Sequence, residues 1–109
     1  MSYSIIATPV FKRELKQLSI KYRSLKTEFS DLIDDLKKNP IMGIPIGHGC
    51  YKIRLSIASK GKGKPGGARV ITSVYVTDFT VFLISIYDKS EKENISDSEL
   101  KKLLRNLTR

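Results

Sequence analysis

The feature that most constrains the fold is an almost continuous apolar run at residues 79–87, which contains the sequence VFLISIY. A strand that is apolar on both faces must be covered on both sides, so it belongs in the middle of a sheet. The run is far shorter than the roughly 18–20 apolar residues that cross a bilayer, so we expect no membrane span. The sequence therefore predicts a central strand with other elements packed against both of its faces.

Two further strands are predicted just before this run. Residues 50–57 alternate between apolar side chains on one face and polar ones, including Lys52 and Arg54, on the other, which is typical of a half-buried strand. Residues 68–76 show the same alternation, and the ASKGKGKPGG segment between the two strands predicts a flexible basic loop. Together with residues 79–87, these strands are predicted to form a three-stranded antiparallel meander.

A helical hairpin is predicted before the strands. Thr8 and Pro9 are a typical N-cap and first helical residue, and the apolar spacing that follows extends this helix to about Lys21. A second apolar stripe of the same spacing begins after Ser24, the predicted N-cap, and ends near Pro40. Because the turn between the two helices is short, they should lie antiparallel.

The remaining segments complete a predicted α+β fold. Residues 3–7 predict a short strand, the glycines and prolines of residues 41–49 predict a connecting loop, and a capping-box pattern from Ser96 to Glu99 starts a last helix. The predicted order is an N-terminal strand, an α-helical hairpin, a three-stranded antiparallel meander and a C-terminal helix. A chain of 109 residues supports one core, so we expect a single domain spanning residues 1–109.

Positive charge is concentrated in the middle of the chain. The formal net charge is +9, from 20 Lys and Arg against 11 Asp and Glu, yet residues 36–77 contain no acidic residue. Such a stretch is typical of a surface that binds a polyanion, and it favours nucleic acid over a merely solvated basic face or an anionic membrane. The basic residues of the stretch are Lys37, Lys38, Lys52, Arg54, Lys60, Lys62, Lys64 and Arg69.

The available residues exclude several classes of site. Cys50 is the only cysteine, so it forms no internal disulfide or cysteine zinc cage and is expected to be a small buried hydrophobe. His48 is the only histidine, which excludes a two-histidine acid–base pair. The glycine-rich loops lack the Walker spacing and no carboxylates lie near the basic segment, so we expect no cofactor and no metal. The N-terminal sequence shows no export signal, and we expect a cytoplasmic protein.

Lys52, Arg54 and Arg69 are the candidate catalytic cations. If residues 50–57 pair with residues 68–76, side-chain parity places all three on one exposed concave face. Such a group can cleave RNA without a metal, because a base can deprotonate the ribose 2′-OH while cations stabilise the phosphorane. Closely spaced cations lower one another's pKa, which allows one lysine among them to act as that base. The alternative is that the three cations only keep the sheet face soluble.

Two other basic groups are predicted to bind RNA or the ribosome. Lysines on the flexible loop suit loose, salt-dependent contacts with a phosphodiester backbone, and the first helix adds a second basic surface. The candidate RNA-binding residues are Lys60, Lys62, Lys64, Lys12, Arg13 and Lys16.

The sequence resembles the RelE/ParE superfamily of bacterial type II toxins, on its RelE and HigB side. The resemblance rests on CYKIRL at residues 50–55, GARVI at residues 67–71 and VFLISIYDK at residues 81–89, each in the expected order and spacing. It covers essentially the whole chain. It implies a toxin that enters the A site of the 30S ribosomal subunit, cleaves messenger RNA there, and is neutralised by an antitoxin protein that wraps it.

The resemblance also implies roles for individual residues. By position, Lys52 matches a catalytic lysine proposed as the general base. Arg54 and Arg69 match cationic residues that stabilise the transition state, and Lys89 lies where RelE-type sequences have a further catalytic arginine.

The sequence departs from the family pattern near its C-terminal end. Where RelE-type sequences carry a catalytic tyrosine this chain has Ile95, so Tyr87 is the candidate substitute. Two alternative functions therefore stay open. One is a ParE-like inhibitor of DNA gyrase, and the other is a non-catalytic nucleic-acid-binding domain or an inactivated toxin.

Overall fold

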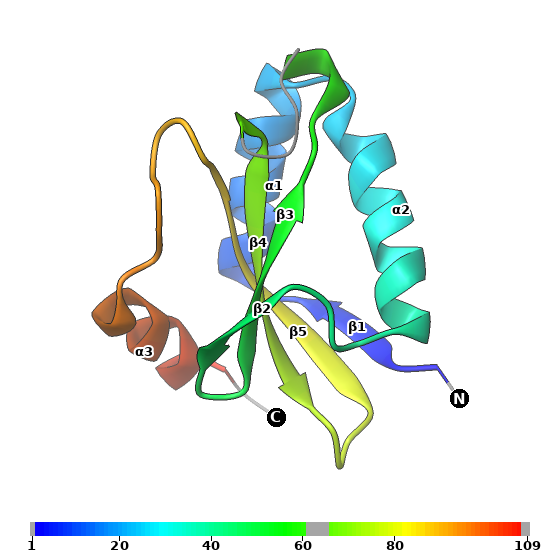
Figure 1. Ribbon diagram of the computed structural model, residues 1–109, viewed down its shortest axis with the longest axis vertical. Coiled ribbons are helices and arrows are strands. Elements are labelled where there is room, and N and C mark those ends of the chain that lie inside the picture. The colour runs from blue at the N-terminus through cyan, green and yellow to red at the C-terminus, as the bar shows by residue number, and fades with distance from the viewer. Residues whose placement is uncertain (1, 61–65, 108–109) are drawn as a thin grey trace.

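The structure, a computed structural model, describes residues 2–60 and 66–107. Its five strands form one sheet in the order β1-β5-β4-β3-β2, in which β1 runs parallel to β5 and the other neighbours are antiparallel (Figure 1). In chain order the elements are β1 (Ser4–Ala7), α1 (Pro9–Lys21), α2 (Leu25–Lys38), β2 (Ile44–Gly47), β3 (Cys50–Leu55), a 3₁₀ turn (Ala58–Lys60), β4 (Ala68–Tyr75), β5 (Thr80–Asp88) and α3 (Asp97–Arg105).

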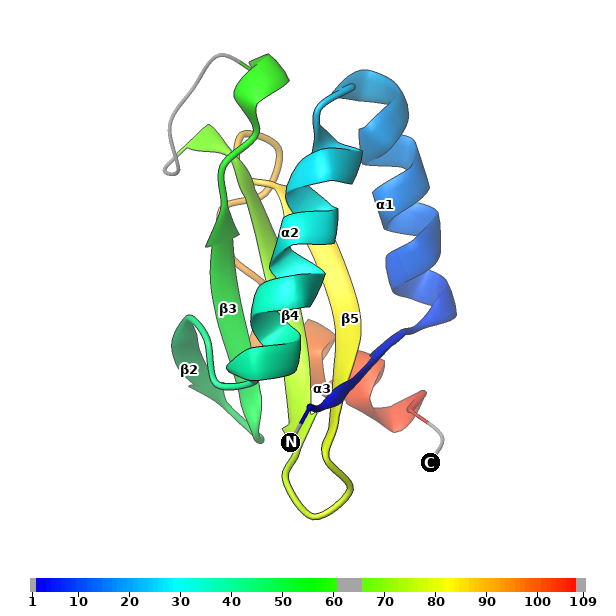
Figure 2. The same cartoon turned by 90° about the vertical axis from the view of Figure 1, so that its right-hand side faces the viewer.

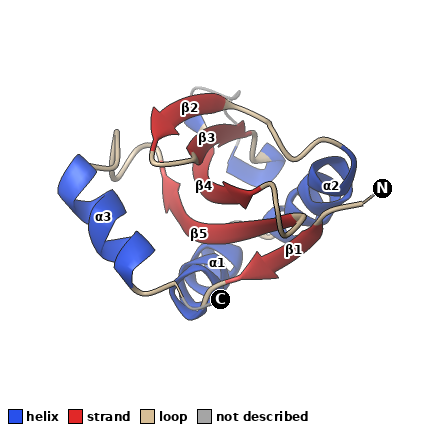
Figure 3. Ribbon diagram, turned by 90° about the horizontal axis from the view of Figure 1, so that it is seen from below, coloured by secondary structure: helices blue, strands red, loops and turns tan. Residues whose placement is uncertain are grey.

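The predicted α+β fold, with its helical hairpin and antiparallel meander, is confirmed. The sheet lies between two helical layers, with α1 and α2 on one side and α3 on the other (Figures 2 and 3). The apolar run at residues 79–87 forms β5, which is buried from Val81 to Asp88 and lies between β1 and β4. Its continuous apolar sequence is explained by this position, because β5 faces helices on both sides.

One strand was not predicted, because the segment of residues 41–49 was expected to be a loop. Residues Ile44–Gly47 instead form β2, which pairs antiparallel with β3 at the edge of the sheet. The register shifts between Pro45 and Gly47, and an edge position tolerates a proline that donates no hydrogen bond. The tight turn to β3 uses positive φ angles at Gly47, His48 and Gly49.

The helix boundaries follow the predicted caps with one exception. The Thr8 hydroxyl accepts a hydrogen bond from the Phe11 backbone at 3.3 Å, and Ser96 and Glu99 form the complete capping box of α3. Ser24, the predicted N-cap of α2, makes no capping bond. Its hydroxyl instead donates to Ser59 at 2.8 Å and so ties the helical hairpin to the turn after β3.

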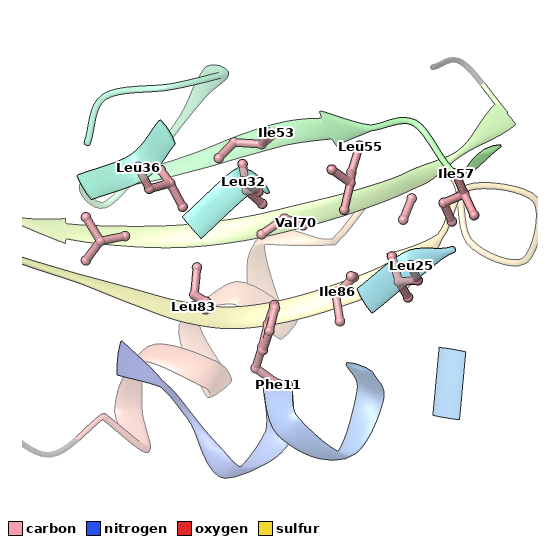
Figure 4. Packing of buried hydrophobic residues seen from close by; sticks show 12 residues of the cluster. Phe11, Leu25, Leu32, Leu36, Ile53, Leu55, Ile57, Val70, Leu83 and Ile86 are labelled. Atoms are coloured by element: carbon pink, nitrogen blue, oxygen red, sulfur yellow. The ribbon is translucent and has the colours of Figure 1, made fainter. Parts of the chain in front are cut away.

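Two apolar clusters fill the two sides of the sheet. Leucines of α2 and Phe11 of α1 point toward the inner face of β3, β4 and β5 (Figure 4). The opposite cluster holds Ile71, Ile84 and Leu100, and it joins β4 and β5 to α3. In the part of the chain that the structure describes, no helix is long and apolar enough to cross a membrane. The face of the sheet toward α3 is the one that carries the predicted catalytic cations.

Candidate functional site

Arg54, Arg69 and Tyr87 lie in one row across three neighbouring strands. Arg54 of β3 is the direct partner of Arg69 in β4, and Arg69 is the direct partner of Tyr87 in β5. Directly opposed residues of antiparallel strands project from the same face, with Cα atoms about 4.5–5.5 Å apart. Tyr87 belongs to the apolar cluster beneath α3, so the row lies on that face of the sheet.

Arg69, at the centre of the row, is buried. The sequence predicted an exposed face for it, and this prediction is wrong, since only 3% of Arg69 is exposed whereas Arg54 beside it is exposed. The Arg69 Nη1 donates to the Ala68 carbonyl oxygen at 3.1 Å. Burial lowers the pKa of Arg69 and the Arg54 guanidinium lowers it further, although an arginine stays protonated at neutral pH. The row therefore carries a concentrated positive charge, part of it shielded from water.

Tyr87 places a neutral phenol at the end of the row. Burial raises the pKa of Tyr87, which keeps the phenol protonated, although the Arg69 charge and the Ile95 backbone act in the opposite direction. Its buried hydroxyl has no hydrogen-bond partner of normal geometry among the described residues. The Lys92 ammonium lies 5.2 Å from the centre of the ring, within the range of a cation–π contact.

Lys52 lies two residues before Arg54 in β3 and therefore projects from the same face. Its Nζ donates to the Asn94 Oδ1 at 3.0 Å. Asn94 lies in the segment of residues 89–96, which runs from the end of β5 to α3 (Figure 1). This segment thus brings Asn94 to Lys52 and Lys92 to Tyr87.

Lys89 is held close to the row by its backbone but not by its side chain. Its N–H donates to the Gly67 carbonyl oxygen at 3.0 Å, next to the start of β4. Its half-buried amine lies 3.8 Å from a carboxylate oxygen of Glu93. The structure therefore places Lys52, Arg54, Arg69 and Tyr87 on one face, and Lys89 at the margin of that face.

Lys60 has a structural setting that the sequence did not predict. Its amine forms an ion pair with Asp88, and the two side chains are 7% and 1% exposed, so the expectation of a lysine on a free, flexible loop is wrong. Asp88 also accepts hydrogen bonds from the Tyr22 hydroxyl at 2.6 Å and the Ser90 hydroxyl at 2.7 Å. Burial alone would raise the pKa of Asp88, but these donors outweigh it and hold the pKa well below its usual range.

The other predicted RNA-binding residues fall into two groups. Lys62 and Lys64 lie outside the described residues. Lys12, Arg13 and Lys16 are exposed on α1, where Lys12 and Lys16 line one groove and Arg13 lies in another with Lys102 of α3. None of the three belongs to the row of Arg54, Arg69 and Tyr87.

Two residues of this site, Lys92 and Asn94, were not predicted from the sequence. They lie in the KSEKEN segment, in which mixed charges and the absence of any apolar period indicate an ordinary solvated linker. No local signal shows that this linker folds back over β3 and β5. Within residues 2–60 and 66–107, no group of three or more His, Cys, Asp or Glu side chains could hold a metal ion.

Comparisons with known proteins identify solved structures with a similar fold. A double mutant of the E. coli toxin RelE in the free state matches with a TM-score of 0.62 and 17% identity, over 99% of this chain and 100% of that chain. The isolated E. coli RelE toxin matches with a TM-score of 0.56 and 18% identity, over 97% and 100% of the two chains. A chain of the toxin–antitoxin complex RelBE2 from Mycobacterium tuberculosis matches with a TM-score of 0.59 and 18% identity, over 81% and 92%.

These identities are low, so the likeness to the solved structures shows the fold alone. The family is shown by the sequence itself, because the model of the RelE toxin of the RelE/RelB toxin–antitoxin system matches residues 4–108. The chain therefore belongs to the RelE family of toxins from toxin–antitoxin systems.

Proposed function

We propose that this protein is a ribosome-dependent endoribonuclease that cleaves messenger RNA in the A site without a metal ion. The observation that carries the proposal is the row of Arg54, Arg69 and Tyr87, with Lys52 on the same face of the sheet. Two guanidinium groups side by side suit a phosphate whose charge increases in the transition state. A solubilising surface would not need one of these cations to be buried.

The proposed reaction uses the nucleophile that RNA itself supplies. The ribose 2′-oxygen attacks the adjacent phosphorus as its proton passes to Lys52, and the bond from phosphorus to the 5′-oxygen breaks. Arg54 and Arg69 stabilise the doubly charged phosphorane, and Tyr87 gives the departing 5′-oxygen a proton. The products are a 2′,3′-cyclic phosphate and a 5′-hydroxyl. DNA lacks the 2′-OH, so it is not a substrate.

Two of the proposed roles depend on the segment of residues 89–96. The Tyr87 hydroxyl is buried, so RNA reaches it only when this segment moves aside. Lys89 lies at the margin of the face, where we propose that it adds positive charge near the scissile phosphate.

We further propose that a cognate antitoxin protein binds this chain and blocks its basic site. The formal charge of +9 favours an acidic segment as the covering part of that partner. The similar M. tuberculosis chain was solved as part of a toxin–antitoxin complex, which supports a partner of this kind. The ribosome, its RNA and the bound message are the other proposed partners, in the cytoplasm.

The test is inducible expression of the protein followed by mapping of messenger RNA ends on ribosomes. Wild type should arrest translation and produce new ends inside translated codons. Lys52→Ala and Arg54→Ala should each lower cleavage by about 100-fold, which is typical when one group that stabilises a transition state is removed. Lys38→Ala, an exposed lysine at the end of α2, is the matched control and should cleave like wild type.

The same experiment separates the proposed function from its alternatives. Undiminished cleavage by both site variants would remove the proposed mechanism. If wild type leaves messenger RNA intact while the purified protein inhibits DNA supercoiling, the chain is a gyrase inhibitor instead. If neither effect occurs, the chain is a nucleic-acid-binding protein or an inactive toxin.

A further inference from the structure

One half of β5 has a helix instead of a strand beside it. β1 pairs with β5 only from Thr80 to Leu83, and at the end of this pairing the Thr8 N–H donates to the Leu83 carbonyl oxygen at 3.1 Å. At Thr8 the chain turns into α1, which lies beside β5 (Figure 3). The backbone groups of a helix bond within the helix, so α1 offers none of them to residues 84–88 of β5.

Glu14 of α1 supplies the hydrogen bonds that a neighbouring strand would otherwise make. Its Oε1 accepts from the Ser85 hydroxyl at 3.0 Å and from the Ile86 N–H at 3.3 Å. Ser85 and Ile86 are 3% and 1% exposed, so water does not replace this oxygen if it is removed. Because a buried donor without an acceptor is costly, the two bonds fix this stretch of β5 to α1.

The setting of Glu14 is unfavourable for an ordinary surface glutamate. Its side chain is half-buried, and burial raises its pKa, although the bonds from Ser85 and Ile86 and the charge of Lys92 act in the opposite direction. A carboxylate that only kept α1 soluble would lie in water. The position of Glu14 therefore indicates a role that outweighs the cost of removing its charge from water.

Grooves lie on both sides of Glu14. One has a volume of about 350 Å³, and its lining includes Glu14, Tyr87 and Lys92. The other has a volume of about 270 Å³, and its lining includes Glu14, Ser85 and Lys92. Because side chains fill neither groove, the position of this stretch of β5 depends on the two Glu14 bonds more than on packing.

The stretch held by Glu14 carries the proposed general acid. Ile86 directly precedes Tyr87, and Tyr87 pairs with Arg69 across the sheet. A shift of the Ile86 backbone therefore moves Tyr87 relative to the guanidinium beside it. Catalytic groups have to be held to within about 0.5 Å of their productive geometry, so a shift of this kind affects the reaction.

We infer that Glu14 is a positioning residue for the proposed cleavage, because its carboxylate holds the end of β5 where Tyr87 lies in the row with Arg54 and Arg69. The inference rests on the proposed function, in which Tyr87 gives a proton to the departing 5′-oxygen. Glu14 does not touch the RNA. It acts only through the strand that carries Tyr87.

The test compares Glu14→Ala and Glu14→Gln with wild type on ribosomes programmed with one message. Glu14→Ala removes the acceptor, so kcat should fall about tenfold, part of the loss expected when a general acid is misplaced, while KM stays unchanged. Glu14→Gln keeps an acceptor oxygen at the same place and should restore kcat to about the wild-type value. Gln17→Ala, at an exposed position on the same helix, is the matched control and should cleave like wild type.

A double variant shows whether Glu14 acts through Tyr87. Tyr87→Phe removes the proposed acid, so adding Glu14→Ala to it should lower kcat no further. A merely structural role of Glu14 would lower kcat by the same factor in both backgrounds. If far-UV circular dichroism shows that Glu14→Ala does not fold, Glu14→Asp replaces it, because it keeps the charge but withdraws the carboxylate by one methylene.

A spectroscopic measurement tests the same inference without any cleavage. In protein with ¹³C-labelled tyrosine rings, Glu14→Ala should shift the Tyr87 ring signals in the NMR spectrum, and Glu14→Gln should return them to the wild-type position. The Tyr3 ring signals should stay in place in both variants, because Tyr3 lies against Phe79, next to the first residue of β5.

The inference is overturned if Glu14→Ala, or Glu14→Asp in its place, cleaves like wild type, or if Glu14→Gln fails to restore kcat. It is also overturned if the loss persists in the Tyr87→Phe background, or if the Tyr87 signals stay in place in Glu14→Ala. Its failure is distinguishable from failure of the proposed function. If wild type cleaves no message, the enzymatic proposal falls, and the Tyr87 signals still decide whether Glu14 holds this strand.

Discussion

Arg69 and Asp88 are two charged side chains buried near the same end of the sheet. The neighbours of Asp88 favour its charge, whereas those of Arg69 include a second cation. Asp88 is 2% exposed and is surrounded by donors from Lys60, Tyr22 and Ser90, which stabilise its charge. Arg69 is 3% exposed and lies beside a second cation, Arg54, and both burial and that cation lower its pKa. Asp88 therefore stabilises the fold, whereas the surroundings of Arg69 lower its pKa. Groups perturbed in this way are concentrated at functional sites.

Asp88→Asn is expected to lower the free energy of unfolding by about 3 kcal/mol at pH 7, because it leaves Lys60 buried without its counter-ion. The folded-state pKa of Asp88 is depressed, so its contribution is present above the unfolded-state pKa of about 4 and is lost as the pH falls toward the folded-state value. The difference between wild type and variant should therefore shrink below about pH 4. Urea denaturation from pH 7 to pH 2 measures it.

Asp31→Asn is the control for this prediction, since Asp31 is exposed on α2. It should change stability by less than about 0.5 kcal/mol at every pH. A pH-independent difference between wild type and Asp88→Asn would contradict the assignment of a depressed pKa to Asp88.

At the scale of elements, the row of Arg54, Arg69 and Tyr87 depends on how closely β4 approaches β3 at its first residues. A Cβ atom added at Gly67 would lie 2.2 Å from the Leu55 carbonyl oxygen, closer than any real contact. Gly67 thus allows β4 to begin against the end of β3, where Leu55 pairs with Ala68 and Arg54 with Arg69.

Gly67→Ala is expected to destabilise the fold by about 2 kcal/mol, as overpacking in a close contact does, and to lower RNA cleavage by shifting Arg69. Gly47→Ala is the comparison. Its Cβ would meet nothing, and only the φ angle of +92° would be strained, so it should cost about 1 kcal/mol and leave cleavage unchanged. Urea denaturation and ribosome cleavage assays measure both effects. Equal cleavage by the two variants would contradict the role of this close approach.

The elements that the sequence predicted well are those with a local signal. The apolar run of β5, the spacing in α1 and the capping box of α3 each depend on neighbouring residues, and all three formed as predicted. β2 gave no such signal, because its glycines and proline indicate a loop and its strand geometry comes from pairing with β3.

The candidate site was only partly predictable, because some of its contacts join residues that are far apart in the sequence. Alternation along β3 and β4 correctly placed Arg54 and Arg69 on one face, but it does not reveal how deeply a side chain is buried. The pairs Lys60–Asp88 and Lys52–Asn94 join residues 28 and 42 positions apart. Such contacts depend on how the loops fold back over the sheet, which no local pattern shows.

At the scale of the whole molecule, the charge of +9 is carried by more than one surface. The row of Arg54 and Arg69 lies on the sheet face toward α3, whereas Lys12, Arg13 and Lys16 are exposed on α1. We propose that the first surface acts on the message and that the second binds ribosomal RNA. Contacts of the second kind release counterions and therefore depend strongly on salt.

A variant that replaces Lys12, Arg13 and Lys16 by Gln should bind 30S subunits more weakly, with a shallower dependence of log affinity on log salt. Three lost phosphate contacts should reduce the slope by about 2. Affinity measured between 50 and 300 mM KCl tests this. The control replaces Lys37 and Lys38, exposed at the end of α2, by Gln and should leave the slope unchanged. An equal reduction in the control would show that only net charge matters.

The central claim is that positioned cations on one sheet face make the 2′-OH of a ribosome-bound message attack its own phosphate. The most direct measurement uses ribosomes programmed with a message that carries a single 2′-deoxynucleotide on the 5′ side of the bond cut in the all-ribose message. The purified protein should leave that bond intact while cutting the all-ribose message to a 2′,3′-cyclic phosphate, and Lys52→Ala should cut the all-ribose message about 100-fold more slowly. Cleavage of the deoxy-substituted bond at the wild-type rate would contradict the account.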